Sequence, residues 1–201
     1  MSHTPHATLT DALSAYQGND GAGIKTPPLD KWQPTETVPF DIVIDHEGNW
    51  RHEGQKMTRQ SLVNLFASVL WGEKDTTGKP HYYLKTPTHL YEICVKDAPL
   101  FITTVERILK DGVSYLQFHT HTGQSVLLDD THTPYFHARP DADGTTDEYA
   151  LYLPMPHGLT AKISRNVFYH LINEGKLCEH ENEVTLTLES GGRTYTLSYP
   201  A

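Results

Sequence analysis

The sequence is short of cysteine and of basic charge. It contains two cysteines, Cys94 and Cys178, and sixteen basic residues against twenty-five acidic ones among 201 residues. Two cysteines cannot build the disulfide framework of a small secreted domain, so we expect free, buried thiols and a reducing compartment. The formal net charge of −9 argues against a DNA or RNA duplex as partner, because phosphate contacts need a basic face.

Long apolar runs and the common catalytic motifs are also absent. No run approaches the roughly 20 apolar residues of a membrane-spanning helix, and residues 1–20 lack the basic start and apolar stretch of a signal peptide. We therefore expect a cytoplasmic protein with no membrane partner. The sequence has no Gly-x-Ser-x-Gly elbow, Walker-type phosphate loop or dinucleotide fingerprint. It therefore indicates no cofactor and favours a protein that is not an enzyme.

A short pattern occurs twice in the chain, in Met57–Phe66 and in Ile163–Ile172. Each copy has an apolar residue, a hydroxyl residue, an arginine and a side-chain amide, followed by apolar residues at helical spacing. Thr58 and Ser164 are predicted N-caps, because a hydroxyl oxygen can accept a hydrogen bond from an unpaired N–H group of the first helical turn. We expect a helix to begin after each of them.

The arginine of each copy occupies an unfavourable position. Arg59 and Arg165 fall at the first helical residue, where the positive end of the helix dipole disfavours a cation. One interpretation is an anion site, because arginine and the free N–H groups of a helix start both favour phosphate or carboxylate. The other is a salt bridge to a nearby acid, or a solvated side chain. The helices are expected to end at Gly72 and Gly175, the first one burying apolar side chains as far as Leu70.

Paired strands flank each predicted helix, with turn residues between alternating apolar positions. The expected strands are 40–45, 50–53, 82–85 and 90–96 around the first helix, and 149–153, 159–162, 183–188 and 193–199 around the second. The sequence therefore predicts an α+β fold of duplicated β-β-α-β-β units with mainly antiparallel sheets. Further strands at 100–109, 113–120 and 125–128 precede a long loop at 129–147. We expect a flexible tail at 1–26 and subdomains at 27–99 and 100–201.

Two other groups are candidates for a site. Trp32 lies between prolines and either fills the edge of the core or forms a stacking wall for a ligand. His119 and His121 alternate on a predicted strand and face the same side, which is a workable start for a metal site. Otherwise these two histidines belong to a solvated polar face. The candidates for a third metal ligand, all in the following loop, are His132, His137, Asp129 and Asp130.

Several words between Pro27 and Leu177 resemble an uncharacterised bacterial family, domain of unknown function 1285. They are PPLDKW at 27–32, GNW at 48–50, LVNLFASVL at 62–70, YLKTP at 83–87, VKDAPL at 95–100, GLTA at 158–161 and RNVFY at 165–169. The resemblance implies an α+β protein of two duplicated subdomains, the second one similar to a pleckstrin-homology fold. It also implies a ligand site where the subdomains meet, a nucleotide-based ligand and a role in signalling.

We therefore expect a cytoplasmic sensor or adaptor that binds a small anionic ligand, such as a nucleotide, between its two subdomains. Arg59, Lys85 and Arg165 are the expected anion partners, and Trp32 is the expected wall of the site. Two alternatives stay open. One is a metal-dependent hydrolase that uses the two alternating histidines, and the other is a module that binds only other proteins.

Overall fold

The computed structural model describes residues 13, 27–140, 147–180 and 183–200. The chain forms two compact units. The first combines residues 1–99 with the turn segment His157–Leu159, and the second contains residues 100–156 and 160–201. The predicted tail at 1–26 lies outside the described residues except for Leu13, which is fully buried. Among the described residues, no helix is long and apolar enough to cross a bilayer.

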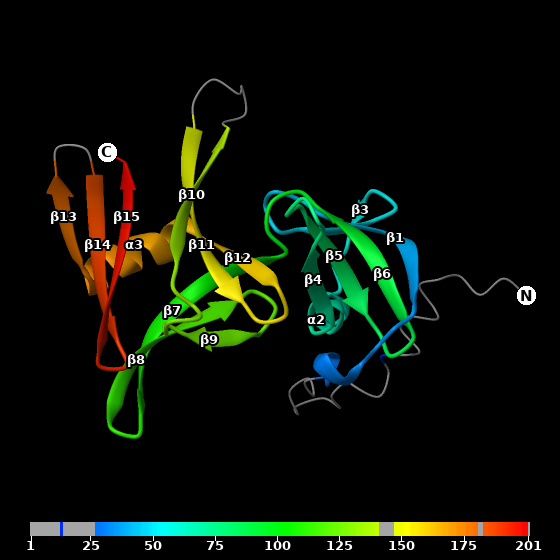
Figure 1. Cartoon of the computed structure of the whole chain (residues 1–201), viewed down its shortest axis with the longest axis horizontal. Coiled ribbons are helices and arrows are strands. Elements are labelled where there is room, and N and C mark those ends of the chain that lie inside the picture. The colour runs from blue at the N-terminus through cyan, green and yellow to red at the C-terminus, as the bar shows by residue number, and fades with distance from the viewer. Residues whose placement is uncertain (1–12, 14–26, 141–146, 181–182, 201) are drawn as a thin grey trace, which may run out of the picture. The chain divides into compact units, whose positions relative to one another are not determined.

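The first unit is built on a six-stranded sheet with the order β3-β2-β1-β6-β5-β4 (Figure 1). Its strands are β1 (Glu36–Ile44), β2 (Trp50–His52), β3 (Gln55–Lys56), β4 (Leu70–Lys74), β5 (Pro80–Lys85) and β6 (His89–Val95). β1 and β6 pair in parallel, and the other neighbours pair in antiparallel fashion. Helix α2 (Gln60–Ala67) follows β3 in the chain, and a 3-10 turn, η2 (Leu29–Lys31), precedes β1.

The core of this unit lies on one face of the sheet. Phe40, Ile42 and Ile44 of β1 are buried at alternate positions, as the period of a half-buried strand predicts. The ring of Phe66 from α2 lies 6.5 Å from that of Phe40 and 6.4 Å from that of Trp50. Fully burying such side chains contributes about 1.5–3 kcal/mol each. The helix therefore covers the inner face of this sheet.

The second unit contains another six-stranded sheet and a separate three-stranded one, with the orders β10-β11-β12-β7-β8-β9 and β13-β14-β15. The first of these sheets consists of β7 (Leu100–Lys110), β8 (Val113–Thr120), β9 (Ser125–Leu127), β10 (Tyr135–Pro140), β11 (Asp147–Met155) and β12 (Leu159–Ile163). Helix α3 (Arg165–Glu174) follows, and then β13 (Lys176–His180), β14 (Glu183–Ser190) and β15 (Arg193–Pro200). β12 and β7 pair in parallel, whereas β13, β14 and β15 are antiparallel.

The two six-stranded sheets have the same topology. If the strands of each sheet are numbered one to six along the chain, the order of neighbouring strands across both sheets is three, two, one, six, five, four. In both sheets the first and sixth strands form a parallel pair. The chain is therefore an α+β protein with two similar mixed sheets. The helices do not occupy equivalent places, because α2 lies between the third and fourth strands of its sheet whereas α3 follows the sixth strand of its own.

The start of the second helix is confirmed, and that of the first is wrong by one residue. Ser164 is the N-cap of α3, its hydroxyl accepts from the backbone N–H of Val167, and Arg165 is the first helical residue. In α2 the N-cap is Arg59 instead of Thr58, and no side chain makes a capping hydrogen bond there. Arg59 is therefore the residue that flanks the start of the helix. At this position the helix dipole disfavours a positive charge less than it does at the first helical residue.

The end of the first helix also differs from the prediction. α2 ends at Ala67, and Leu70 already belongs to β4, although it is buried as expected. Gly72 lies inside that strand and does not terminate a helix. α3, by contrast, ends with Gly175 at its C-cap. A short run of apolar residues after a helix fits either another helical turn or the start of a strand. The apolar spacing alone therefore did not reveal that the chain changes from helix to strand after Ala67.

Two further expectations are corrected. The predicted loop at 129–147 contains β10, which pairs with β11 from Tyr135–Tyr152 to Pro140–Asp147, and residues 141–146 lie outside the described residues. Both cysteines are free, but Cys94 is exposed and Cys178 is half-buried, so neither is the buried thiol that we expected. Cys94 falls on the polar face of β6, beside the buried Ile93, because strand residues alternate.

Candidate functional site

Trp71 of β4 brings three polar side chains together on the outer face of the first sheet. The Nζ atom of Lys85, on the neighbouring β5, lies 3.4 Å from the centroid of the Trp71 ring. The indole Nε1 of Trp71 donates a hydrogen bond of 2.8 Å to Glu73 Oε1. The imidazole of His157 stacks on the same indole at a centroid distance of 5.4 Å and an interplanar angle of 28°. We call these four residues the Trp71 cluster.

The strand register explains why Lys85 faces Trp71. Trp71 is paired with Tyr83 across β4 and β5, and Lys85 lies two residues further along β5. Side chains two residues apart in a strand point to the same face. Lys85 therefore extends over the indole from the adjacent strand, on the face that α2 does not cover.

A close approach of two backbone segments positions His157. Gly72 N–H donates to the carbonyl oxygen of His157 at 2.9 Å, within the first unit. A Cβ atom built on Gly72 would overlap the carbonyl oxygen of Gly158, and one built on Gly158 would overlap that of Gly72. Gly158 also has a φ of +69°, which favours glycine. The two glycines therefore let the His157 turn lie directly on β4, where its ring reaches Trp71.

Lys85 is unusual because most of the residue is buried and its ammonium has no protein oxygen as acceptor among the described residues. The residue as a whole is 6% exposed. Within the described part of the chain, its ammonium has the Trp71 ring as partner and forms no salt bridge or side-chain hydrogen bond. Burial lowers the pKa of Lys85, while the carboxylates of Glu73 and Asp30 oppose that shift. Three N–H donors are thus held in a partly apolar place without an oxygen to receive them.

Both neighbouring carboxylates are bound to other donors. Glu73 accepts the Trp71 indole N–H. Asp30, in the turn η2, lies with its Oδ1 3.3 Å from Nδ1 of His157. The two acids therefore act on Lys85 through space, and neither forms a salt bridge with it.

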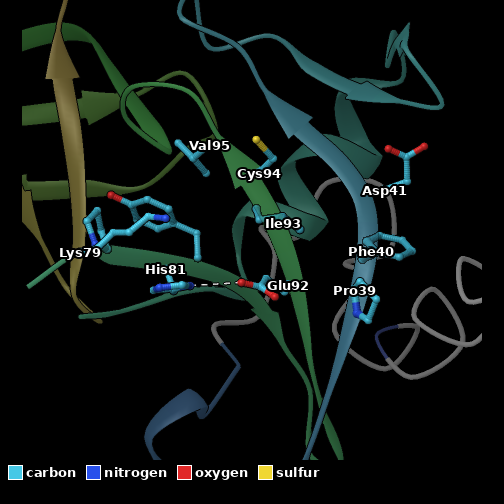
Figure 2. Close-up of a pocket in the computed structure, with 11 residues that line it drawn as sticks. Pro39, Phe40, Asp41, Lys79, His81, Glu92, Ile93, Cys94 and Val95 are labelled. Atoms are coloured by element: carbon cyan, nitrogen blue, oxygen red, sulfur yellow. Dashed lines mark hydrogen bonds and ion pairs between the residues drawn. The ribbon is translucent and has the colours of Figure 1, made fainter. Parts of the chain in front are cut away.

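A cavity of about 680 Å³ opens elsewhere on the first unit (Figure 2). It is lined by residues 39–41 of β1, residues 79–82 and residues 92–95. The strand register accounts for it. Pro39 pairs with Glu92 and Val43 with Cys94, so three residues of β1 lie opposite the single residue Ile93 of β6. Such an irregularity bends a strand and disrupts its ladder locally, which separates β1 from β6 at this level.

His81 and Glu92 form a polar wall of this cavity. Its Nδ1 lies 3.2 Å from Glu92 Oε1, a contact drawn as a dashed line in Figure 2, and its Nε2 lies 3.4 Å from Asp75 Oδ2. The carboxylate of Glu92, and then that of Asp75, raise the pKa of His81. The hydroxyl of Thr77 is the main cause that lowers the pKa of Asp75 to about 2. An imidazole between two carboxylates therefore links β5 to β6 and to the turn after β4.

The four residues expected to bind the ligand are dispersed. Lys85 belongs to the Trp71 cluster. Trp32 is half-buried and follows the turn η2 that carries Asp30. Arg59 is exposed, and its Nε donates to Ser61 Oγ at 3.2 Å. Arg165 is exposed on α3, so these two arginines belong to different units of the chain.

The two alternating histidines have protein partners already. His119 Nε2 lies 2.9 Å from Glu106 Oε1, and His121 Nδ1 lies 3.5 Å from the carbonyl oxygen of Phe101. Burial lowers the pKa of His121, which keeps that imidazole neutral near pH 7. Among the described residues, no three His, Cys, Asp or Glu side chains lie close enough together to hold a metal ion.

Sequence reasoning missed most of the Trp71 cluster. Trp71 and Glu73 alternate with Gly72, a period that fits a strand as well as a helix end, and their pairing with β5 would have required the register. The Gly158 that follows His157 was a signal, because a glycine at a turn often marks a positive φ or a close backbone approach. Its partner Gly72 is distant in the sequence, so the contact itself could not be inferred.

Comparison with known proteins agrees with this architecture. Residues 27–98 match the model of the N-terminal domain of the DUF1285 family, a domain of unknown function, and residues 99–197 match that of its C-terminal domain. A crystal structure of a DUF1285 family protein from Silicibacter pomeroyi DSS-3 is similar at a TM-score of 0.71, with 28% identity and 92% of each chain covered.

A second solved structure, of a DUF1285 family protein from Shewanella baltica OS155, has 27% identity and a TM-score of 0.48, and covers 66% of this chain and 91% of its own. The search of curated proteins found no match. Because the two family models together span all residues from 27 to 197, the chain belongs to the DUF1285 family.

Proposed function

We propose that the protein binds a small anionic ligand, such as a nucleotide, and that Lys85 pairs with its negative charge. The observation that carries this proposal is Lys85, a residue only 6% exposed, whose ammonium has an indole face beside it and no oxygen acceptor among the described residues. A charged group removed from water is costly unless it is paired and hydrogen-bonded. An anion from solution would supply the missing acceptor.

The cation–π contact alone is a weaker explanation for this arrangement. Contact with a Trp ring stabilises a cation by about 0.5–2 kcal/mol, but it gives the three N–H donors no oxygen. An anion at Lys85 would complete the hydrogen bonding and keep the contact with Trp71. Trp32, Arg59 and Arg165 remain proposals as further ligand contacts, to be tested separately from Lys85.

We further propose that ligand binding serves a sensing or signalling role in the cytoplasm. The pleckstrin-homology resemblance of the C-terminal half belongs to the same proposal. Support comes from the architecture, since the first unit, which contains Lys85, is followed by a second unit that repeats its sheet topology.

A thermal-shift series tests the anion proposal. Purified protein is melted with adenine nucleotides and with inorganic phosphate at millimolar concentration. A ligand present at a hundred times its Kd stabilises by about 2.7 kcal/mol, which corresponds to a rise in Tm of roughly 5–10 °C for a chain of this size. We expect at least one of these anions to stabilise the protein.

Variants then assign the binding to residues. Lys85→Met should lose the stabilisation, whereas Lys56→Met, an exposed lysine of β3 in the same unit, should keep it. Arg59→Ala and Arg165→Ala show whether either arginine at a helix start contributes to the stabilisation by the anion. No shift with any anion, or an unchanged shift in Lys85→Met, contradicts the proposal.

A further inference from the structure

The Trp71 cluster and the neighbouring Asp30 together contain more carboxylates than lysine or arginine side chains. Lys85 is the single lysine or arginine in it, and the carboxylates of Glu73 and Asp30 both act on that ammonium. Glu73 is fixed by the Trp71 indole N–H at 2.8 Å, and Asp30 by the contact of 3.3 Å with Nδ1 of His157.

These residues would attract the first negative charge of a ligand and repel a second one. The first negative charge meets the Lys85 ammonium, whose donors have no acceptor within the described residues. A second negative charge finds no other lysine or arginine in the cluster and is repelled by two carboxylates close by.

We infer that Lys85 selects a singly charged anionic group, a carboxylate or a phosphodiester, over phosphomonoesters and polyphosphates. The inference rests on the proposed function, because it assumes that Lys85 binds an anion. It narrows the nucleotide ligands to those in which the phosphate is esterified twice.

A charge series with a constant base tests this selection. The probes are adenosine, adenosine 3′,5′-cyclic monophosphate, AMP, ADP and ATP, at pH 7.5, fixed ionic strength and without divalent cations. Benzoate is the carboxylate probe. Binding is measured by calorimetry and by tryptophan fluorescence, to which Trp71 contributes from beside Lys85. We expect affinity to fall from the cyclic monophosphate to AMP, which carries between one and two charges at this pH, and to be at least tenfold weaker for ATP.

Glu73 provides a direct test of whether repulsion by a carboxylate causes the selection. Glu73→Gln keeps an oxygen acceptor for the Trp71 N–H but removes one negative charge. We expect it to strengthen ATP binding at least threefold relative to the cyclic monophosphate. Glu183→Gln, an exposed acid of β14 in the other unit, should leave the ratio unchanged. Lys85→Met should abolish binding of all the charged probes.

The outcomes separate the two claims. If no anionic probe binds, the proposed function itself fails. If anions bind but ATP binds as tightly as the cyclic monophosphate, anion binding stands and the selection for single charge is overturned. An unchanged ratio in Glu73→Gln overturns the selection mechanism as well. Binding of benzoate alone, or of the cyclic monophosphate alone, identifies which singly charged group the site accepts.

Discussion

Replacing Gly158 with alanine should disrupt the Trp71 cluster by a backbone clash. Gly158 has a φ of +69°, and its added Cβ would overlap the carbonyl oxygen of Gly72. Left-handed backbone costs a residue with a Cβ about 1–2 kcal/mol. Relief of the overlap would separate the turn from β4, which removes the Gly72–His157 hydrogen bond, worth about 0.5–1.5 kcal/mol, and the ring contact with Trp71, worth about 0.5–1.5 kcal/mol.

Gly54→Ala is the matched control. Gly54 has a φ of +74°, but its added Cβ would meet no atom within 4 Å. Both variants therefore carry the same conformational strain, and only Gly158→Ala carries the clash. We expect Gly158→Ala to lower the free energy of unfolding by roughly 1–3 kcal/mol more than Gly54→Ala.

Tryptophan fluorescence during urea denaturation measures the difference cleanly. Trp32, Trp50 and Trp71 are the three tryptophans of the sequence, and all belong to the first unit. The signal therefore follows the unit that contains both glycines. Equal losses of stability in the two variants would refute the reasoning that Gly72 and Gly158 are in obligatory backbone contact.

Three further predictions concern buried or charged side chains. The Ser190 hydroxyl donates to one buried backbone carbonyl at 2.8 Å and accepts from one backbone N–H at 3.1 Å. Ser190→Ala should therefore lower the free energy of unfolding by about 3 kcal/mol, measured by urea denaturation followed by circular dichroism. A loss below about 1 kcal/mol contradicts this. His81 has a raised pKa, chiefly through Glu92, so its contribution to stability is complete below pH 6.5 and is lost as the pH rises through the folded-state pKa. The stability difference between wild type and His81→Gln should therefore shrink above that pH, and a difference that grows would count against the ion pair. Burial lowers the pKa of Lys85, so the unfolded state binds more protons between the folded-state pKa and 10.5, and wild-type stability should rise with pH in that window relative to Lys85→Met.

Local sequence patterns were sufficient for much of the fold. The alternation in β1, the strands of the β7–β8 hairpin and both ends of α3 follow from features within a few residues of one another. In α3 the Ser164 hydroxyl and the Gly175 backbone act on the adjacent helical turns. These are interactions that a segment makes with itself, so the sequence of the segment is enough to predict them.

Places where distant segments compete were not predictable in the same way. Val69 and Leu70 continue the apolar spacing of α2, yet the chain extends after Ala67 because β4 pairs with β5. Strand pairing is a non-local choice that overrides weak helix propensity. The split between β1 and β6 depends likewise on the register of two segments that are far apart in the chain.

The sequence by itself determined the family, most of the strands and the presence of a lysine, a tryptophan and an acid near one another in the chain. Tertiary structure decided which of these residues form a site. Lys85 became a buried cation because its strand places it over Trp71, and His157 joined because two glycines allow the backbones to touch. Burial and contact are properties of the packed chain, and they convert an ordinary surface lysine into a candidate anion partner.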